Sequence, residues 1–175
     1  MSVESAGTLG EIAATSSSRL ARLYEEHVGR AVGLATLLTG DRAIAEDIAH
    51  DAFLRVAGRF HDLRDPAAFG PYLRTTVVNM CRARGRRLDR ERTALHRSPR
   101  PEVVQADESA EDRDLLWGLI KRLPYRQRAA LVLKYWEDLT EAQIGQILRC
   151  SPRAVNALLS RAKKTLRDDI GGNDG

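Results

Sequence analysis

Cysteines, aromatic residues and long apolar runs are all scarce in this sequence of 175 residues. The two cysteines, Cys81 and Cys150, stand far apart and outside any CxxC or Cys/His cluster, so the sequence predicts no zinc site. One disulfide and two free thiols are both open, and a reducing cytosol favours the thiols. No apolar run approaches the roughly 18 residues that a spanning helix needs. We therefore expect a soluble, cytoplasmic protein without a signal peptide.

Recognisable catalytic patterns are also missing. The four histidines, His27, His50, His61 and His96, form no HExxH motif and no ligand set with cysteine. There is no nucleophile elbow and no glycine loop of the kind that binds phosphate. We therefore expect no enzyme activity, no cofactor, no metal and no small-molecule substrate.

Charged residues, by contrast, make up 30% of the chain, and the formal net charge is +4. Positive charge dominates in residues 19–92 and 115–175, whereas negative charge dominates in residues 93–114. Two basic blocks fit a polyanionic partner such as nucleic acid, but the solvated surfaces of helices often have net charges of this size as well. Charge alone leaves both interpretations open.

Helical periodicity is the main structural signal. Apolar residues recur at helical spacing from Leu20 to Leu38, after a candidate cap at Ser18, and no strand pattern or repeat is visible. Gly40 is placed to end this helix, and Asp41 to cap the next one. Since aromatics are only 5% of the residues, the core must be aliphatic, which favours packed helices. The sequence predicts an all-α fold of two small helical domains joined by a flexible linker.

Proline, glycine and charge divide the chain into parts. Gly70-Pro71 is expected to interrupt a helical stretch, and a longer helix to run from about Pro71 towards Leu88. The predicted parts are a disordered tail (1–18), a first domain (19–92), an acidic linker with prolines (93–112), a second domain of about four helices (113–170) and a C-terminal tail (171–175).

Residues 140–167 have the spacing of a helix-turn-helix. A capping box opens a short helix at Thr140, and Ser151 and Pro152 suit the N-cap and first position of the last helix. The polar face of that helix offers arginine and asparagine, which bond to guanine and adenine edges. A solvated basic helix is the alternative, and the capped turn favours DNA. The candidate base-reading residues are Arg153, Asn156, Ala157, Ser160, Arg161 and Lys164.

The second block resembles a known family. The run LPYRQR at residues 123–128, the run YWEDLT at 135–140 and the run LSRA at 159–162 resemble region 4 of the extracytoplasmic-function (group 4) sigma factors of the sigma-70 family. The resemblance implies that this domain reads the promoter −35 element. Arg149 stands where the family usually has glycine, which implies strain if a positive φ is required there. Leu158 replaces a common arginine, so the family's base preference does not transfer.

The first block resembles sigma region 2. Residues 45–56 (AEDIAHDAFLRV) look like region 2.2, the family's main contact with the β′ clamp helices of RNA polymerase. The resemblance implies that Asp47, His50, Asp51 and Arg55, which share the exposed face by spacing, bind core polymerase. By themselves these charges would more often form a plain solvated face. His50 replaces the usual glutamine, which implies a hydrogen bond that depends on pH.

Residues 69–87 resemble regions 2.3 and 2.4, which bind the melted non-template strand at the −10 element. The resemblance implies that arginines hold phosphates and that Asn79 meets a base edge. Phe69 and Tyr72 are available for stacking on bases, although we expect Phe69 in the core and the family often has tryptophan in place of Tyr72. The candidate −10 residues are Arg74, Asn79, Arg82, Arg84, Arg86 and Arg87.

Together these likenesses cover residues 20–168 and imply a sigma factor. Its expected partners are core RNA polymerase (β′ clamp helices and β flap) and promoter DNA, and the family commonly adds an anti-sigma factor, which can hold its sigma factor at the membrane. The alternative is a stand-alone helix-turn-helix regulator, dimeric on a palindrome. That alternative explains the second block but neither the basic segment 74–92 nor the acidic linker.

Overall fold

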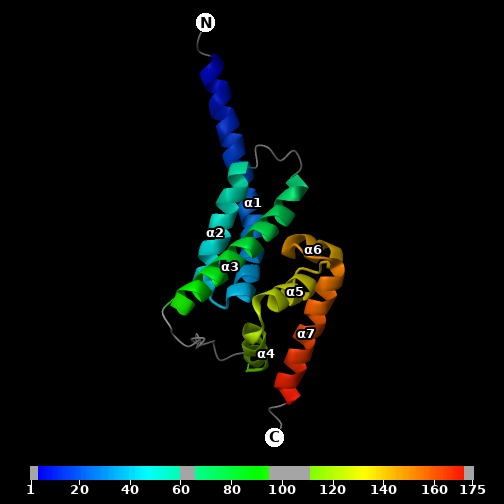
Figure 1. Ribbon diagram of the computed structural model, residues 1–175. Helices are drawn as coiled ribbons and strands as arrows, with labels where there is room; N and C mark the ends of the chain where they lie inside the picture. The colour runs from blue at the N-terminus through cyan, green and yellow to red at the C-terminus, as the bar shows by residue number, and fades with distance from the viewer. Residues whose placement is uncertain (1–3, 60–65, 95–110, 172–175) are drawn as a thin grey trace.

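The computed structural model describes residues 4–59, 66–94 and 111–171, and within these ranges it is helical, without a strand (Figure 1). The all-α prediction is confirmed. The elements are α1 (Glu4–Thr39), α2 (Arg42–Arg59), a 3-10 turn η2 (Pro66–Ala68), α3 (Phe69–Ala94), α4 (Glu111–Arg122), α5 (Tyr125–Tyr135), α6 (Glu141–Leu148) and α7 (Pro152–Gly171).

Helices α1, α2 and α3 pack against one another and form the first domain. Their shared core contains three aromatic rings in a row. The ring centroid of Phe53 lies 5.0 Å from that of Tyr24 and 5.4 Å from that of Phe69. Phe69 is fully buried, as expected, so it is not available to stack on a base. The other fully buried large side chains of this domain are Leu34, Leu38, Val56, Val77 and Val78.

The turn between α1 and α2 follows the sequence prediction. Gly40 ends α1 with a φ of 79°, a left-handed conformation that glycine adopts without steric cost. Asp41 then caps α2, because its Oδ1 accepts a hydrogen bond from the backbone N–H of Ile44 at 3.0 Å. Local chemistry therefore fixes where the first two helices meet.

Other boundaries differ from the prediction. Helix α1 begins at Glu4, so residues 4–18 are helical rather than a disordered tail. Serine, threonine and glycine, which are weaker helix formers than alanine, make up eight of these fifteen residues, so helix propensity does not explain this end of α1. Helix α3 begins at Phe69, and Gly70-Pro71 lies in its first turn without interrupting it. The N–H groups of a first turn have no partner within the helix, so proline is tolerated there.

The linker prediction lies mostly outside the described residues. Helix α3 continues past Leu88 to Ala94, and α4 begins at Glu111, so the linker's two ends are helical. Residues 95–110 between them, and the last residues, 172–175, are not described.

Helices α4 to α7 form the second domain, with the four helices that the sequence predicts. Helix α7 packs against α4, α5 and α6, and α5 packs against α6. The most deeply buried side chains of this core include Leu133, Ile144 and Val155. None of the described helices is long and apolar enough to cross a membrane.

The two domains are packed together through α5, which lies against α1 and α3 (Figure 1). The hydroxyl of Tyr125 donates a hydrogen bond of 2.8 Å to the backbone oxygen of Val78 on α3. The ring of Trp136 lies 3.2 Å from the point that a Cβ on Gly33 would occupy, so glycine in α1 allows this close approach. Nothing in the sequence pattern predicts this packing.

Candidate DNA and polymerase interfaces

The helix-turn-helix begins with the predicted capping box. The hydroxyl of Thr140 accepts a hydrogen bond from the backbone N–H of Gln143, and the Gln143 side chain accepts one from the backbone N–H of Thr140. At α7, the Ser151 hydroxyl accepts from the N–H of Ala154 at 3.2 Å, and Pro152 is the first helical residue. Both predicted caps are confirmed.

The turn between α6 and α7 is tight. Arg149 adopts the left-handed conformation (φ 53°, ψ 58°), so the positive φ on which the predicted strain depends is present there. The N–H of Cys150 donates to the carbonyl of Gly145 at 2.9 Å, and a Cβ at residue 145 would lie 2.6 Å from the Cys150 oxygen. Glycine at 145 is therefore required for α7 to take its place.

All six candidate base-reading residues lie exposed on α7, opposite the buried stripe formed by Val155, Leu159 and Ala162. No ion pair links their charged members to another described residue. The charged members are Arg153, Arg161 and Lys164. Leu158 is half-buried at the edge of the stripe. One helix face thus offers two guanidinium groups, an amide, a hydroxyl and an ammonium to a partner.

This domain also exposes two aromatic side chains at the end of α5. Tyr135 and Trp136 are both exposed. The ammonium of Lys163 lies 5.3 Å from the centre of the Tyr135 ring, close enough for a cation–π interaction. Lys163 therefore contacts the Tyr135 ring, whereas Lys164, the next residue, lies on the exposed candidate base-reading face.

The candidate polymerase-binding residues Asp47, His50, Asp51 and Arg55 are all exposed on α2. Sequence reasoning missed Leu54, which is 55% exposed. Its position four residues after His50 and seven after Asp47 was the available signal, because this spacing puts all three on one helix face.

A groove of about 510 Å³ runs beside this face between α1 and α2. Its walls combine acidic side chains of α2, Asp47 and Asp51, with apolar ones of α1, Val28 and Val32. The Tyr24 ring meets the His50 ring edge-on at a centroid distance of 6.3 Å. The lining of the groove therefore combines acidic and apolar side chains.

The candidate −10 residues on α3 do not share one face. At about 100° per residue, Arg74 and Asn79 project about 140° apart around the helix. Arg74 and Arg82 are partly buried, whereas Asn79 is exposed, as are the other three arginines. Those three are Arg84, Arg86 and Arg87.

Two side chains on α3 already have hydrogen-bond partners, Arg87 on α3 itself and Tyr72 on α2. The guanidinium of Arg87 donates to Glu91 at 2.8 Å, which raises its pKa. Tyr72 is exposed, and its hydroxyl oxygen accepts a hydrogen bond of 3.2 Å from Arg59. Tyr72 therefore remains available to stack on a base.

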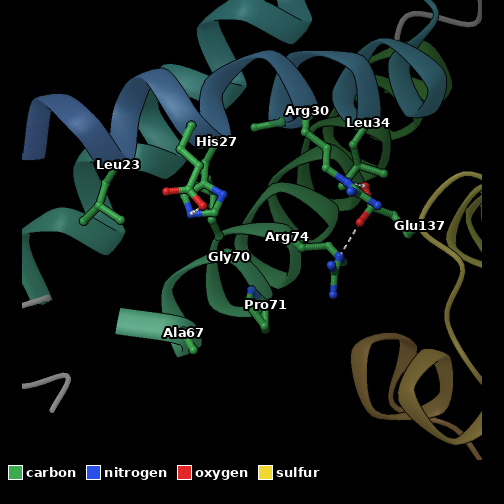
Figure 2. Close-up of a pocket in the computed structure, with 12 residues that line it drawn as sticks. Leu23, His27, Arg30, Leu34, Ala67, Gly70, Pro71, Arg74 and Glu137 are labelled. Atoms are coloured by element: carbon green, nitrogen blue, oxygen red, sulfur yellow. Dashed lines mark hydrogen bonds and ion pairs between the residues drawn. The ribbon is translucent and has the colours of Figure 1, made fainter. Parts of the chain in front are cut away.

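Arg74 is instead part of a buried ion-pair cluster (Figure 2). Its Nε donates to Oε2 of Glu137 at 2.6 Å, and the Nε of Arg30 donates to Oε1 at 3.1 Å. The Glu137 side chain is only 2% exposed, and Arg74 is 22% exposed. The cluster lines a cavity of about 410 Å³ between α1 and α3, where the His27 ring stacks on Phe69.

Both cysteines are free thiols. Cys81 is buried on α3, and burial raises the pKa of its thiol to about 12. Burial likewise raises the pKa of nearby Tyr125 and lowers that of Arg128, whose guanidinium lies 5.9 Å from the Tyr125 ring centre. Within the described residues, no group of His, Cys, Asp and Glu could hold a metal ion.

Known proteins match both domains. The family model described as Sigma-70 region 2 matches residues 23–91, and that of Sigma-70, region 4 matches residues 113–166. The chain is 30% identical to the ECF RNA polymerase sigma factor SigL of Mycobacterium tuberculosis (strain Erdman), over 89% of this chain and 90% of that protein. It is 29% identical to the RNA polymerase sigma-E factor of Streptomyces coelicolor, over 80% and 79% respectively.

Other likenesses are partial or concern the fold. The probable RNA polymerase sigma factor RfaY of Xanthomonas campestris pv. campestris is 33% identical over 78% of this chain, which spans only 36% of its length. The structure is similar to the sigma factor RpoE crystallised with the anti-sigma factor NepR from Bartonella quintana (TM-score 0.70, 17% identity, 88% of this chain and 97% of that chain). With SigL matched over almost its full length and both sigma regions present in order, the chain belongs to the extracytoplasmic-function sigma factors of the sigma-70 family.

Proposed function

We propose that this sigma factor directs promoter-specific initiation with a separate surface for each step. The exposed α2 face binds core RNA polymerase, α3 holds the melted −10 strand, and α7 reads the −35 element. The observation that carries the proposal is the exposure of all six candidate base-reading side chains on one face of α7. The partners are core polymerase and promoter DNA, the protein acts in the cytoplasm, and it catalyses no reaction of its own.

The α7 face has the chemistry that a major-groove helix needs. Arg153 and Arg161 can each donate two hydrogen bonds to a guanine edge, and Asn156 can pair with an adenine edge. Ala157 leaves room for a thymine methyl group, and Lys164 suits a phosphate. Because the turn before α7 is held by the Ser151 cap and a required glycine, the face is presented in one orientation.

The α2 face suits a basic, partly apolar helical partner. Asp47 and Asp51 would attract positive charge and set the orientation of binding, and the exposed Leu54 supplies apolar contact in the middle of the face. The groove beside it, which Val28 and Val32 help to line, offers space for an apolar side chain of the partner.

The exposed side of α3 suits an unpaired strand. Asn79, Arg86 and Arg90 project within about 40° of one another at about 100° per residue, which puts an amide beside two phosphate-binding cations. Tyr72 adds an exposed ring earlier on the same helix. Asn79→Ala should impair opening of the −10 region more than binding of closed duplex, which a permanganate footprint would measure.

The stand-alone regulator is not favoured, because the first domain matches sigma region 2 as well as the second matches region 4. Run-off transcription on a fragmented genomic library tests the choice, with purified core RNA polymerase alone and with the protein added. Specific starts that need the protein support the sigma factor, and aligning them yields its −35 and −10 elements. Tight binding of the protein alone to a palindromic duplex, without stimulation of polymerase, would favour the regulator.

A further inference from the structure

Glu137 ties the second domain to the first. It follows α5, whereas its two arginine partners, Arg30 on α1 and Arg74 on α3, belong to the first domain (Figure 2). Each carboxylate oxygen accepts a hydrogen bond from one guanidinium, at 3.1 Å and 2.6 Å. A carboxylate that is 2% exposed must be paired in this way, because an unpaired buried charge is very costly.

This contact is suited to opening. Burial removes hydration from the Glu137 carboxylate and from most of Arg74, whereas the Arg30 side chain remains 58% exposed, so the net gain over separated, hydrated ions is small. Separation of the domains would return Glu137 and Arg74 to water together, with no charge left buried alone. The cluster therefore gives the closed arrangement a specific geometry without making it irreversible.

Arg74 has two possible partners that exclude each other: the carboxylate of Glu137 and a phosphate of the −10 strand. Its proposed role is to hold a phosphate of the −10 strand, and a guanidinium binds phosphate and carboxylate through the same N–H donors. In the closed arrangement its Nε is bonded to Glu137, and only 22% of the side chain is exposed. The exposed Asn79 and Arg86, on another side of α3, remain free of this competition.

Promoter geometry requires the domains to separate. The −35 and −10 elements are about 25 base pairs apart by their numbering, or about 85 Å at about 3.4 Å per base pair. Helices α3 and α7 both pack against α5, and the axes of packed helices lie about 8–10 Å apart, so in the closed arrangement the two DNA-binding helices are separated by far less than about 85 Å. One packed molecule cannot contact both elements on straight DNA.

From these observations we propose that Glu137 acts as an internal competitor of promoter phosphate. In the free factor it binds Arg74 and Arg30 and holds the second domain closed on the first. Binding to polymerase and promoter replaces the carboxylate on Arg74 with a phosphate of the −10 strand and separates the domains. The inference rests on the proposed function, in which α3 holds the −10 strand, and on the phosphate-binding role that the family resemblance implies for Arg74.

The test uses the full chain without polymerase and a 20-nucleotide thymidine strand as the probe. Glu137→Gln keeps the size of the side chain and removes its charge. We expect a larger radius of gyration by X-ray scattering and binding of the strand that is at least about threefold tighter. The slope of log affinity against log salt should steepen by about 0.7, as one further phosphate contact predicts for a single strand. In an Arg74→Gln background, Glu137→Gln should give no such gain.

Two further variants keep the test decisive. Arg30→Gln removes one of the two arginine partners of Glu137, and Arg30 is not part of the proposed DNA surface. This variant should show the same changes, and it provides the test if Glu137→Gln fails to fold. Glu141→Gln is the matched control, since it removes an ion pair of 3.1 Å with Lys134 inside the second domain and should change nothing. Folded Glu137→Gln and Arg30→Gln variants with wild-type dimensions and affinity would overturn the inference, as would opening without tighter binding.

Run-off transcription with core polymerase separates this inference from the proposed function. If the wild-type protein supports specific starts but removal of the Glu137 charge leaves the free factor unchanged, the internal competition is wrong and the sigma function stands. If the Glu137→Gln variant opens and binds the strand more tightly while no form supports transcription, the competition stands and the proposed function fails.

Discussion

The carbonyl oxygen of Cys150 lies 2.6 Å from the point that a Cβ would occupy at Gly145, across the turn between the two helices of the DNA-reading motif. Because the clash is with backbone, no side-chain rearrangement can relieve it. We expect Gly145→Ala to lower the free energy of unfolding by about 1–3 kcal/mol, measured by urea denaturation.

Gly118→Ala is the matched control for that prediction. Gly118 lies within α4, and a Cβ there would have no heavy atom within 4 Å. Alanine favours helix over glycine by about 1 kcal/mol, so this variant should be as stable as the wild type or more stable. Equal stability of the two variants would show that the turn can adjust.

The ends of helices were predictable where a cap is local. Gly40, Asp41, Thr140 and Ser151 each act on residues within a few positions, so the sequence alone contains the whole interaction. The start of α3 was not predicted correctly. Proline is tolerated in the first turn of a helix, and it also commonly follows the end of one, so Pro71 fits either position. The pattern alone does not distinguish these two cases.

The candidate binding residues were likewise predictable where their arrangement depends on a single helix. On α7, one helix contains both the buried stripe and the polar face, so spacing identifies the exposed residues. The cluster around Glu137 could not be found in this way, since its partners Arg30 and Arg74 lie 107 and 63 residues away in the chain. Only the packing of α5 on the first domain brings them together.

Arg149 should be replaceable with a gain in stability. Its φ of 53° is unfavourable for any residue with a Cβ, whereas glycine adopts it freely. We expect Arg149→Gly to raise the free energy of unfolding by about 0.5–1 kcal/mol. Arg149→Val should lower it, because a β-branched side chain is least compatible with this conformation. If urea denaturation showed Arg149→Val to be more stable than Arg149→Gly, the positive φ at residue 149 would not be what limits stability there.

The buried thiol of Cys81 should make stability depend on alkaline pH. Its pKa is raised by burial from 9.0 to about 12, so the folded state keeps its proton where the unfolded state loses it. The contribution is complete below pH 9 and declines as the pH rises towards 12, by about 1.4 kcal/mol between pH 8 and pH 10. Cys81→Ala should remove this part of the pH dependence, whereas Cys150→Ala should retain it. Identical pH profiles for wild type and Cys81→Ala would refute the assignment.

The acidic residues of α2 should control binding to core polymerase. Reversal of both charges, in an Asp47→Lys/Asp51→Lys variant, should weaken binding at least about tenfold and leave the helical signal unchanged. The control is Asp168→Lys/Asp169→Lys at the end of α7, which changes the net charge equally and should bind nearly as well as the wild type. Equal losses in the two variants would attribute the effect to net charge, and unchanged affinity for the first would remove α2 from the interface.

Arg161 should carry sequence information, and Arg167, about one and two-thirds turns further along α7, should not. Arg161 is exposed on the candidate base-reading face, whereas the Nε of Arg167 donates to the carbonyl of Lys163 at 3.3 Å and the side chain lies further along the helix. Once the −35 element is known from run-off starts, Arg161→Ala should weaken binding to it by about 1–3 kcal/mol and relax the base preference at one position. Arg167→Ala should weaken binding to all sequences alike and reduce the dependence on salt by about one phosphate contact. A loss for Arg161→Ala that is the same for every sequence and follows the salt concentration would instead place Arg161 on a phosphate, and the reading of the −35 element would then depend on Arg153 and Asn156.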